Sequence, residues 1–260
     1  MSSHSTRRGV ASVMTSSTYR PASAAEARFL AEYDASAYAT PLVTVDPVIV
    51  TLRDEQLAVL LVKREEHPFL GSWGLPGGFI DIRNDADPEA CAVRKLKEKA
   101  AFVSPYLEQV KTVGGRERDP RGWSLTVLFF ALIAEDDVPP IDKRLAKWFP
   151  LSALPDAMAF DHRALIDCAI RRIRAKAEYT ALPAHLLPQR FTLSKMQRVF
   201  ELVLQRRLTA GAFRRRIEPL VEPIADCFET ASHRPAQVYR LRPDSGSLIF
   251  EQPLKGARRK

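Results

Sequence analysis

The chain has 260 residues, which is long enough for two compact domains. Its hydrophobic content of 46% and charged content of 27% are ordinary for a soluble globular protein. No apolar run approaches the roughly 20 residues that a membrane span requires, so a membrane protein is excluded. Three widely spaced cysteines, Cys91, Cys168 and Cys227, indicate neither a disulfide framework nor a zinc site. We therefore predict a reducing, cytoplasmic setting, with no bound metal and no cofactor.

The positive charge is concentrated at one end of the chain. There are 39 Lys and Arg against 31 Asp and Glu, a net charge of +8. Positions 186–260 alone hold 15 basic and 7 acidic residues, so the preceding 185 residues are neutral. A solvated basic surface would give the same count, but such segregation favours an acidic polymer as partner, nucleic acid above all.

The first domain begins after a stretch rich in Ser and Thr. Residues 1–25 lack the apolar core of a signal peptide, and we predict a disordered leader. β-Branched residues then fill 42–50 and 57–62 on either side of a polar turn at 53–56, which predicts a pair of strands. With the elements that follow, they predict a domain over 26–179.

Helices and further strands alternate through this domain. Asp87 before Pro88 is a good helix start, and we expect that helix to reach about Ala100. An apolar run predicts a buried strand at 125–134, and 148–151 is a short edge element.

A second helix is predicted from a cap at Asp161 to about Lys176. Its apolar stripe consists of Leu165, Cys168, Ala169 and Ile173. Strands and helices in this order predict an α+β protein whose first domain is a mixed sheet between helices, an α/β/α sandwich.

The helix that begins at Asp87 carries an unusual charge pattern. Lys95, Glu98 and Lys99 are three and four residues apart, so they project from one face. Hydrolysis of a pyrophosphate with Mg²⁺ needs several oxygen ligands around the ion, and one carboxylate beside two ammonium groups does not supply them. Two interpretations remain. The lysines are solvated, with Glu98 paired to one of them, or they replace the metal and hold a pyrophosphate directly.

The pattern changes beyond a predicted linker at 180–188. Thr192 is a helix N-cap followed by an amphipathic helix, and Thr209 caps a second, arginine-rich helix after a short turn. Short alternating runs at 225–230 and 236–242 predict a two-stranded wing. Apolar residues expected to face inward are Met196, Val199, Phe200, Val203, Phe213 and Ile217.

This layout predicts a winged helix-turn-helix over 189–245, followed by a basic tail at 246–260. Its arginines and capped helix ends would grip the phosphates of double-stranded DNA, and one or two side chains would reach base edges. An exposed arginine run alone is often only a solvated face. The residues that we expect to contact DNA are Thr192, Lys195, Arg206, Arg207, Thr209, Arg214, Arg215, Arg216 and Arg234.

The segment from Gly71 to Phe102 resembles the Nudix box, the catalytic motif of a family of pyrophosphohydrolases. Arg94, Leu96 and Glu98 match the family pattern. Lys95 and Lys99 stand where the pattern has metal-binding glutamates. The resemblance therefore implies the Nudix fold, with a hydrolytic site that is broken.

Taken together, the two predicted domains resemble the NrtR family, the Nudix-related transcriptional regulators of NAD metabolism. The resemblance implies a sensor of an ADP-ribose-type nucleotide joined to a winged helix that represses transcription as a homodimer on a palindromic operator. Some relatives sense sugars instead, and Gln205 and Gly211 depart from the family's DNA-binding segment. The stretches that carry the resemblance are Phe29–Asp34, Val43–Asp46, Trp73–Gly78, Asp119–Trp123, Ala159–His162, Phe191–Leu193, Phe213–Arg215 and Arg234–Ala236.

The resemblance also suggests an effector pocket. Arginines would contact phosphates, a tryptophan would stack on adenine, and glycines would serve a backbone turn. The alternatives are surface ion pairs for the arginines and core packing for the tryptophans. The residues assigned to this pocket are Arg64, Trp73, Gly77, Gly78, Arg94, Lys95, Glu98, Lys99, Arg116, Arg121 and Trp123.

Two other functions compete with that of a ligand-responsive repressor. A Nudix hydrolase with an accessory basic domain is disfavoured by Lys95 and Lys99. An RNA-binding adaptor is disfavoured because no basic sheet with stacking aromatic residues is predicted.

Overall fold

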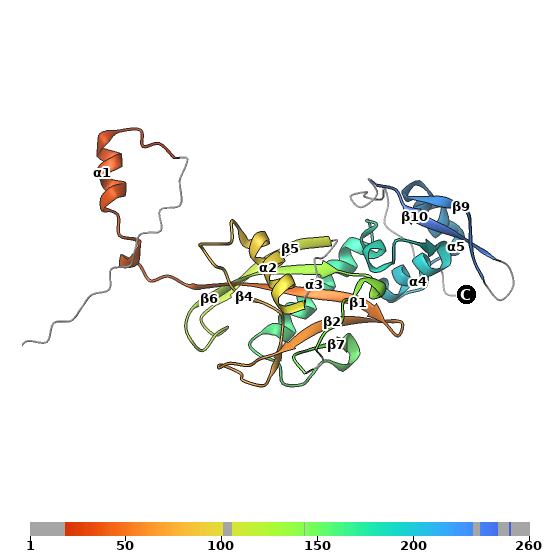
Figure 1. The fold of residues 1–260 in the computed structure, drawn as a ribbon, viewed down its shortest axis with the longest axis horizontal. Coiled ribbons are helices and arrows are strands. Elements are labelled where there is room, and N and C mark those ends of the chain that lie inside the picture. Colours follow the sequence, from red (N-terminus) through yellow and green to blue (C-terminus); the bar gives the residue numbers. More distant parts are fainter. Residues whose placement is uncertain (1–18, 101–105, 143, 231–234, 244–249, 251–260) are drawn as a thin grey trace, which may run out of the picture.

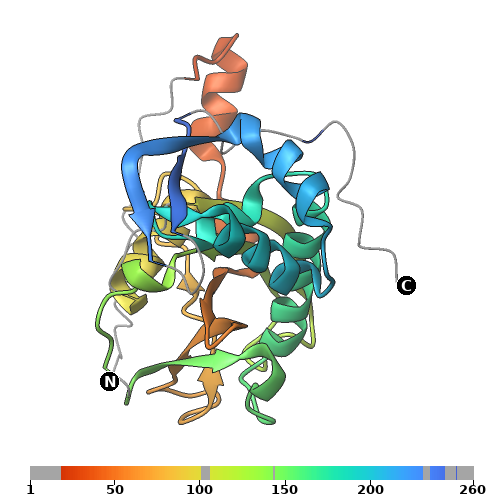
Figure 2. The same ribbon diagram turned by 90° about the vertical axis from the view of Figure 1, so that its right-hand side faces the viewer.

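The computed structural model describes residues 19–100, 106–142, 144–230, 235–243 and 250. Within these residues a seven-stranded sheet with two packed helices is followed by a smaller domain with a three-stranded sheet (Figure 1). Figure 2 shows the smaller domain from its own end of the molecule. The predicted α+β class with two domains is confirmed.

The large sheet is mixed. Its strand order is β3-β2-β1-β6-β5, with β4 paired to β1 and β7 paired to β2. The central pair, β1 and β6, is parallel from Leu42↔Ser124 to Val50↔Leu132, and the other pairs are antiparallel. The strands are β1 Leu42–Arg53, β2 Gln56–Lys63, β3 Trp73–Gly74, β4 Gly78–Phe79, β5 Tyr106–Gly115, β6 Ser124–Leu132 and β7 Ala146–Pro150.

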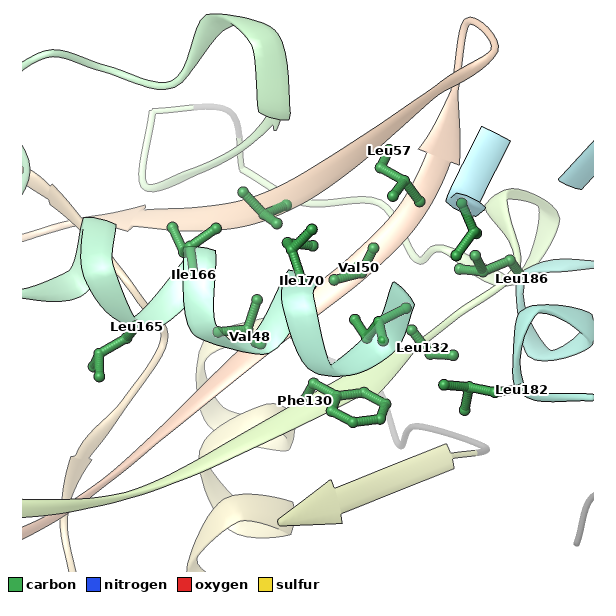
Figure 3. Packing of buried hydrophobic residues seen from close by; sticks show 14 of the residues in the cluster. Val48, Val50, Leu57, Phe130, Leu132, Leu165, Ile166, Ile170, Leu182 and Leu186 are labelled. Atoms are coloured by element: carbon green, nitrogen blue, oxygen red, sulfur yellow. The ribbon is translucent and has the colours of Figure 1, made fainter. Parts of the chain in front are cut away.

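Two helices cover the two faces of this sheet. Side chains alternate along a strand, so Val48 and Val50 of β1 pack with α3, His162–Ala177, while Ile49 packs with α2, Pro88–Ala100. Figure 3 shows α3 lying across β1 and β6, with Ile166 and Ile170 turned into the core. The predicted α/β/α sandwich is confirmed.

The two helices begin differently. At α2, Pro88 is the first residue and the Asp87 carboxylate accepts a hydrogen bond from the Ala90 amide at 2.7 Å, as predicted. At α3, Asp161 occupies the N-cap position but its side chain makes no capping bond. It pairs with Arg118 instead, because a guanidinium forms a stronger, charge-assisted contact. The side-chain cap predicted for Asp161 is therefore wrong.

The smaller domain has the predicted winged helix-turn-helix order. The Thr192 hydroxyl caps the first helix by accepting from the Lys195 amide at 3.3 Å, and Gln205 ends that helix with a positive φ of 54°. The side-chain cap predicted for Thr209 is wrong, because no such bond forms. The elements are β8 Phe191–Thr192, α4 Leu193–Leu204, α5 Ala210–Ile217, β9 Val221–Glu229 and β10 Ala236–Leu241.

The segment predicted to be a linker is buried. Leu182–Leu186 form a 3₁₀ turn whose leucines are 2% and 3% exposed. They join one apolar cluster with Val50 and Leu57 of the sheet and with Val199 and Val203 of α4. The segment connects the domains, as expected, but it is packed between them and is not an exposed linker.

The N-terminal part stands apart from the two domains. Helix α1, Ala24–Glu32, and the turn after it extend away from the body, with Phe29, Tyr33 and Tyr38 exposed (Figure 1). Most of the predicted leader and of the basic tail, and also Arg234, lie outside the described residues. In the described part of the chain, no helix combines the length and the apolar character needed to cross a bilayer.

Leu182→Ala should destabilise both domains together. Removing a fully buried leucine costs about 2–5 kcal/mol, and this side chain contacts the core of the large sheet. Urea unfolding should show one lower midpoint by tryptophan fluorescence and by far-UV circular dichroism. Leu30→Ala, at an exposed position of α1, is the control and should leave the midpoint unchanged. Separate transitions for the two domains would contradict the shared core.

Candidate effector pocket and DNA interface

A pocket forms where β1 changes its partner. The start of β1 pairs with β4, at Thr44↔Phe79 and Val45↔Gly78, and its end pairs with β2 from Val50 onward. Between these ladders lie Asp46 and Pro47, and a proline has no N–H with which to continue the pairing. The sheet opens at this point into a pocket of about 290 Å³.

Six predicted effector residues line the pocket. They come from the end of β2, the β3–β4 segment, α2 and the loop before β6, and they are Arg64, Gly77, Gly78, Lys95, Lys99 and Arg121. Arg118 adds a fifth cationic side chain, against the carboxylates of Asp46, Glu66 and Asp119. The lining therefore carries a positive excess, which suits an anionic ligand.

Lys95 and Glu98 form an ion pair, which is one of the two interpretations that the sequence left open. The Lys95 ammonium lies 3.0 Å from a Glu98 carboxylate oxygen, and its stem passes over Gly78. Lys95 lines the pocket whereas Glu98 does not. Lys99, on the same face, reaches the pocket from an exposed position. The pocket thus has two ammonium groups on the helix face where a Nudix enzyme carries carboxylates.

Arg94 fixes the loop before α2. Its guanidinium donates to both carboxylate oxygens of Asp85, at 2.7 and 2.5 Å, and to Glu98 at 2.9 Å. Because of these hydrogen bonds from Arg94, the pKa of the Asp85 carboxyl lies far below its usual range. Burial opposes that effect at Glu98, but hydrogen bonds from Lys95 and Arg94 lower its pKa as well. Arg94 positions these carboxylates and does not line the pocket.

Phe160 holds two arginines at the pocket wall. The guanidinium carbon of Arg64 lies 4.9 Å from the centre of this ring, and that of Arg121 lies 5.8 Å away. Burial lowers the pKa of Arg64, and the nearby charge of Arg121 lowers it further. An anion between them would relieve that repulsion. Phe160 itself has a φ of 51°, which a bulky residue rarely adopts away from functional sites.

Asp46, Arg118 and His162 form the floor of the pocket. Arg118 binds Asp161 with two hydrogen bonds, at 2.8 and 2.9 Å, and lies 3.6 Å from Asp46. His162 accepts a hydrogen bond from the Leu75 amide at 2.9 Å and lies 3.8 Å from Asp46. These contacts connect β1, the β3–β4 segment and the start of α3.

The remaining predicted effector residues lie elsewhere. Trp73 packs in the core, edge to face with Phe149 at 5.1 Å, and Trp123 is 48% exposed beside Gly114. Arg116 is exposed and, like the two tryptophans, does not line the pocket. For Trp73 the core-packing alternative fits the structure better than stacking on a ligand, whereas Trp123 lies neither in the core nor in the pocket lining.

The candidate DNA interface lies at the N-terminal ends of α4 and α5. A groove there is lined by Ser194 and Gln197 of α4, Arg214 of α5, and Gln237 and Tyr239 of the wing. Arg215 is exposed on the same helix as Arg214, whereas Arg216 is half-buried, with Phe250 5.7 Å from its guanidinium. Small residues fill the first turn of α5, Ala210–Ile217, which leaves the helix free to approach a surface closely.

The other residues predicted to contact DNA differ in their exposure and in their partners within the protein. Arg206 pairs with Glu178 at the end of α3, at the junction between the domains, and its contact with DNA stays a prediction. Arg207 binds the buried carboxylate of Glu201 at 3.0 Å while remaining largely exposed. Lys195 is exposed and pairs with Glu229 of the wing. Thr192 is buried as the cap of α4, and Thr209 is exposed at the start of α5.

Comparisons with known proteins identify both domains. A model of the NUDIX domain matches residues 43–169, and one of the NrtR DNA-binding winged helix domain matches residues 183–241. An ADPR responsive transcriptional repressor of Acinetobacter baylyi is 44% identical over 236 residues, which are 88% of this chain and 94% of that protein. The chain belongs to the NrtR family.

Solved structures agree with this family. Shewanella oneidensis NrtR complexed with a 27-mer DNA is 43% identical, with a TM-score of 0.75 over 82% of this chain and 99% of that chain. The NUDIX domain of the same NrtR complexed with ADP-ribose is 48% identical, with a TM-score of 0.52 over 56% of this chain and 97% of that chain. An ADP-ribose pyrophosphatase of Methanocaldococcus jannaschii is 31% identical over 135 residues, covering 52% of this chain and 76% of that enzyme.

Sequence reasoning missed several pocket residues of this NrtR family member. Asp46 left a signal, because a carboxylate followed by proline is unusual within a buried strand. Phe160 and His162 flank the helix start at Asp161, and only the fold brings them beside Gly77. In the DNA-binding domain, Ser194 and Gln197 line the groove beside α5 but are uncharged, so they gave no signal in the sequence.

Asp85→Asn should change how stability depends on pH. The pKa of Asp85 is lowered in the folded protein by Arg94, so its contribution is present above the unfolded pKa of about 3.9 and is lost as pH falls. Below about pH 4 the free energy of unfolding should therefore fall less steeply in the variant than in the unmodified protein. Chemical denaturation between pH 3 and 7 measures this. Asp167→Asn, on the exposed side of α3, is the control; equal slopes for Asp85→Asn and the unmodified protein would exclude the ion pair.

Proposed function

We propose that this protein is a transcriptional repressor that binds double-stranded DNA and responds to ADP-ribose. The observation that carries the proposal is one chain with a Nudix pocket whose lining has an excess of positive charge and, on the same core, an arginine-bearing winged helix. The named functions of its relatives in Acinetobacter and Shewanella support it. The genes it controls are expected to be those of NAD metabolism, as the family resemblance implies.

The proposed receptor does not hydrolyse its ligand. Pyrophosphate hydrolysis in this fold requires Mg²⁺ or Mn²⁺ held by several carboxylates. In the described residues, no three His, Cys, Asp or Glu side chains are placed to hold a metal ion. Lys95 and Lys99 would repel the cation and attract the pyrophosphate instead. The same substitutions that remove catalysis therefore support binding.

DNA binding is assigned to α5 and the groove beside it. The exposed guanidinium groups of Arg214 and Arg215 would reach phosphates or base edges, and the start of α4 with Ser194 would contact the backbone. Two copies of this domain would read a palindromic operator, with half-sites one helical turn or a multiple apart. A homodimer is therefore part of the proposal.

Two elements connect the pocket with the DNA-binding domain. Helix α3 begins with His162 at the pocket, and at its other end Arg174 donates to the Val203 carbonyl at 3.3 Å while Glu178 binds Arg206. Strand β1 likewise runs from Asp46 at the pocket toward the turn in which Glu55 pairs with Arg198 of α4 at 2.8 Å.

This connection gives the ligand a route to the winged helix. ADP-ribose needs only a different affinity for the DNA-competent and DNA-incompetent arrangements of the domains. A coupling free energy of about 1–3 kcal/mol corresponds to a change of about 5–150-fold in DNA affinity.

Arg214→Ala combined with Arg215→Ala should weaken DNA binding and its dependence on salt. When two phosphate contacts are lost, DNA binding releases fewer counterions. The slope of log K against log[salt] should therefore fall by about 2 in magnitude. Fluorescence anisotropy with an operator-bearing duplex from 50 to 300 mM salt measures it. Arg144→Ala, at an arginine of the effector domain that is 88% exposed, is the matched control. An unaltered slope in the double variant would exclude α5 from the interface.

Glu178→Gln combined with Glu55→Gln should weaken the response to ADP-ribose. The variant loses the Glu55–Arg198 and Glu178–Arg206 ion pairs, which join the two domains and are partly screened by solvent. The ratio of DNA affinities measured without and with ADP-ribose should shrink by about two- to fivefold, while ADP-ribose affinity in the absence of DNA changes little.

Three outcomes separate the competing functions in that experiment. An unchanged ratio would reject the two ion pairs as the route of coupling. A ratio of one in the unmodified protein would reject ADP-ribose as the effector. Conversion of ADP-ribose to AMP in a parallel reaction with Mn²⁺ would support a hydrolase, whereas the proposal expects the ligand to remain intact.

A further inference from the structure

The floor of the pocket holds a carboxylate whose two cationic or imidazole neighbours stand beyond hydrogen-bond distance. Asp46 is 5% exposed and lines the pocket, with Arg118 at 3.6 Å and His162 at 3.8 Å. Both distances exceed the 2.7–3.2 Å of a hydrogen bond involving N–H. Among the described residues, none donates a hydrogen bond to the Asp46 carboxylate. A donor on a bound ligand would therefore add a hydrogen bond that the described residues do not supply.

His162 presents a donor to the same place. Its Nδ1 accepts from the Leu75 amide at 2.9 Å, so the neutral ring carries its proton on Nε2. Burial lowers the pKa of His162, which keeps the ring neutral near pH 7. Nε2 is the atom 3.8 Å from a carboxylate oxygen of Asp46. A donor and an acceptor therefore face each other across a gap too wide for a direct bond.

Two glycines hold these groups in position. A Cβ at Gly77 would lie 2.0 Å from the nearer Asp46 oxygen and 2.5 Å from the Val45 carbonyl. A Cβ at Gly74 would lie 2.8 Å from His162 Nδ1. The backbone of the β3–β4 segment thus packs directly on both side chains, and no side chain fits between. The gap is a built feature of the fold.

We propose that Asp46 and His162 form a subsite for a hydroxyl group of the ligand. An oxygen about 2.8 Å from both atoms spans their separation of 3.8 Å. A hydroxyl donates to the carboxylate and accepts from the ring N–H through that one oxygen, which neither a phosphate nor an ammonium group does.

The cationic residues around this subsite define the rest of the ligand. Lys95, Arg64 and Arg121 line the pocket around the floor and suit a pyrophosphate. The ligand class is therefore a nucleoside diphosphate whose terminal phosphate carries a second sugar, and the inference rests on the proposed function. A nucleoside diphosphate without this terminal sugar would place no terminal hydroxyl at the floor. Its phosphates would also approach the negative charge of Asp46.

The test compares ADP-ribose with ADP by isothermal titration calorimetry on the full chain. The unmodified protein should prefer ADP-ribose by about tenfold or more, because losing hydrogen bonds to buried polar groups is heavily penalised. In Asp46→Asn, ADP-ribose should bind at least about tenfold more weakly. ADP should bind equally or more tightly, because a negative charge has been removed.

A second variant keeps the negative charge of Asp46 but displaces its carboxylate. Gly77→Ala forces the Asp46 carboxylate from its place, so the preference for ADP-ribose should fall there too. Asp167→Asn, on the exposed side of α3, should behave like the unmodified protein. Thermal melting without ligand establishes that each variant is folded.

The outcomes distinguish the subsite from the proposed function. An unchanged preference in Asp46→Asn would overturn the subsite while leaving ADP-ribose as the effector. Equal affinity of the unmodified protein for ADP-ribose and ADP would overturn the subsite while leaving a phosphate-binding pocket. Binding of neither ligand would overturn the effector assignment and the subsite with it.

Discussion

The burial of α3 is the constraint on which the rest of the structure depends. This helix of 16 residues fills one face of the large sheet, and the same apolar cluster continues into the 3₁₀ turn Leu182–Leu186 and α4. Packed interiors do not deform gradually, so a shift of α3 must repack the contacts at both of its ends. One end forms part of the pocket and the other meets the DNA-binding domain. The fold thereby joins the two domains mechanically.

Charge decides what the pocket holds. Two unit charges 4 Å apart interact by about 4 kcal/mol at an effective dielectric constant of 20. Replacing a carboxylate with an ammonium reverses the sign of that interaction with both a metal ion and a phosphate. In the proposed receptor, Lys95 and Lys99 would therefore repel a metal cation and attract an anion. The fold is retained because the core under α2, with Leu96 and Ala100, is untouched by these surface exchanges.

The sequence predicted what local chemistry controls. β-Branched runs, Asp87 before Pro88 and the cap at Thr192 specify elements within a few residues, and these elements formed as expected. It could not predict where long or charged side chains turn, because that depends on partners distant in sequence. Asp161 pairs with Arg118, and Arg206 pairs with Glu178, which lies 28 positions away in the sequence. Two prolines in 180–188 suggested a linker, but Leu182 and Leu186 in this segment are buried by tertiary packing.

The pocket floor lies where a ligand can act on α3 most directly. His162 is the first residue of that helix, and Asp46 lies on β1, the other element that runs toward the winged helix. Leaving a buried donor or acceptor without a partner costs about 1–3 kcal/mol. Coupling between sites is commonly about 1–3 kcal/mol as well. A ligand hydroxyl that satisfies both groups in only one arrangement of α3 therefore supplies enough free energy to switch DNA binding, with no need for catalysis.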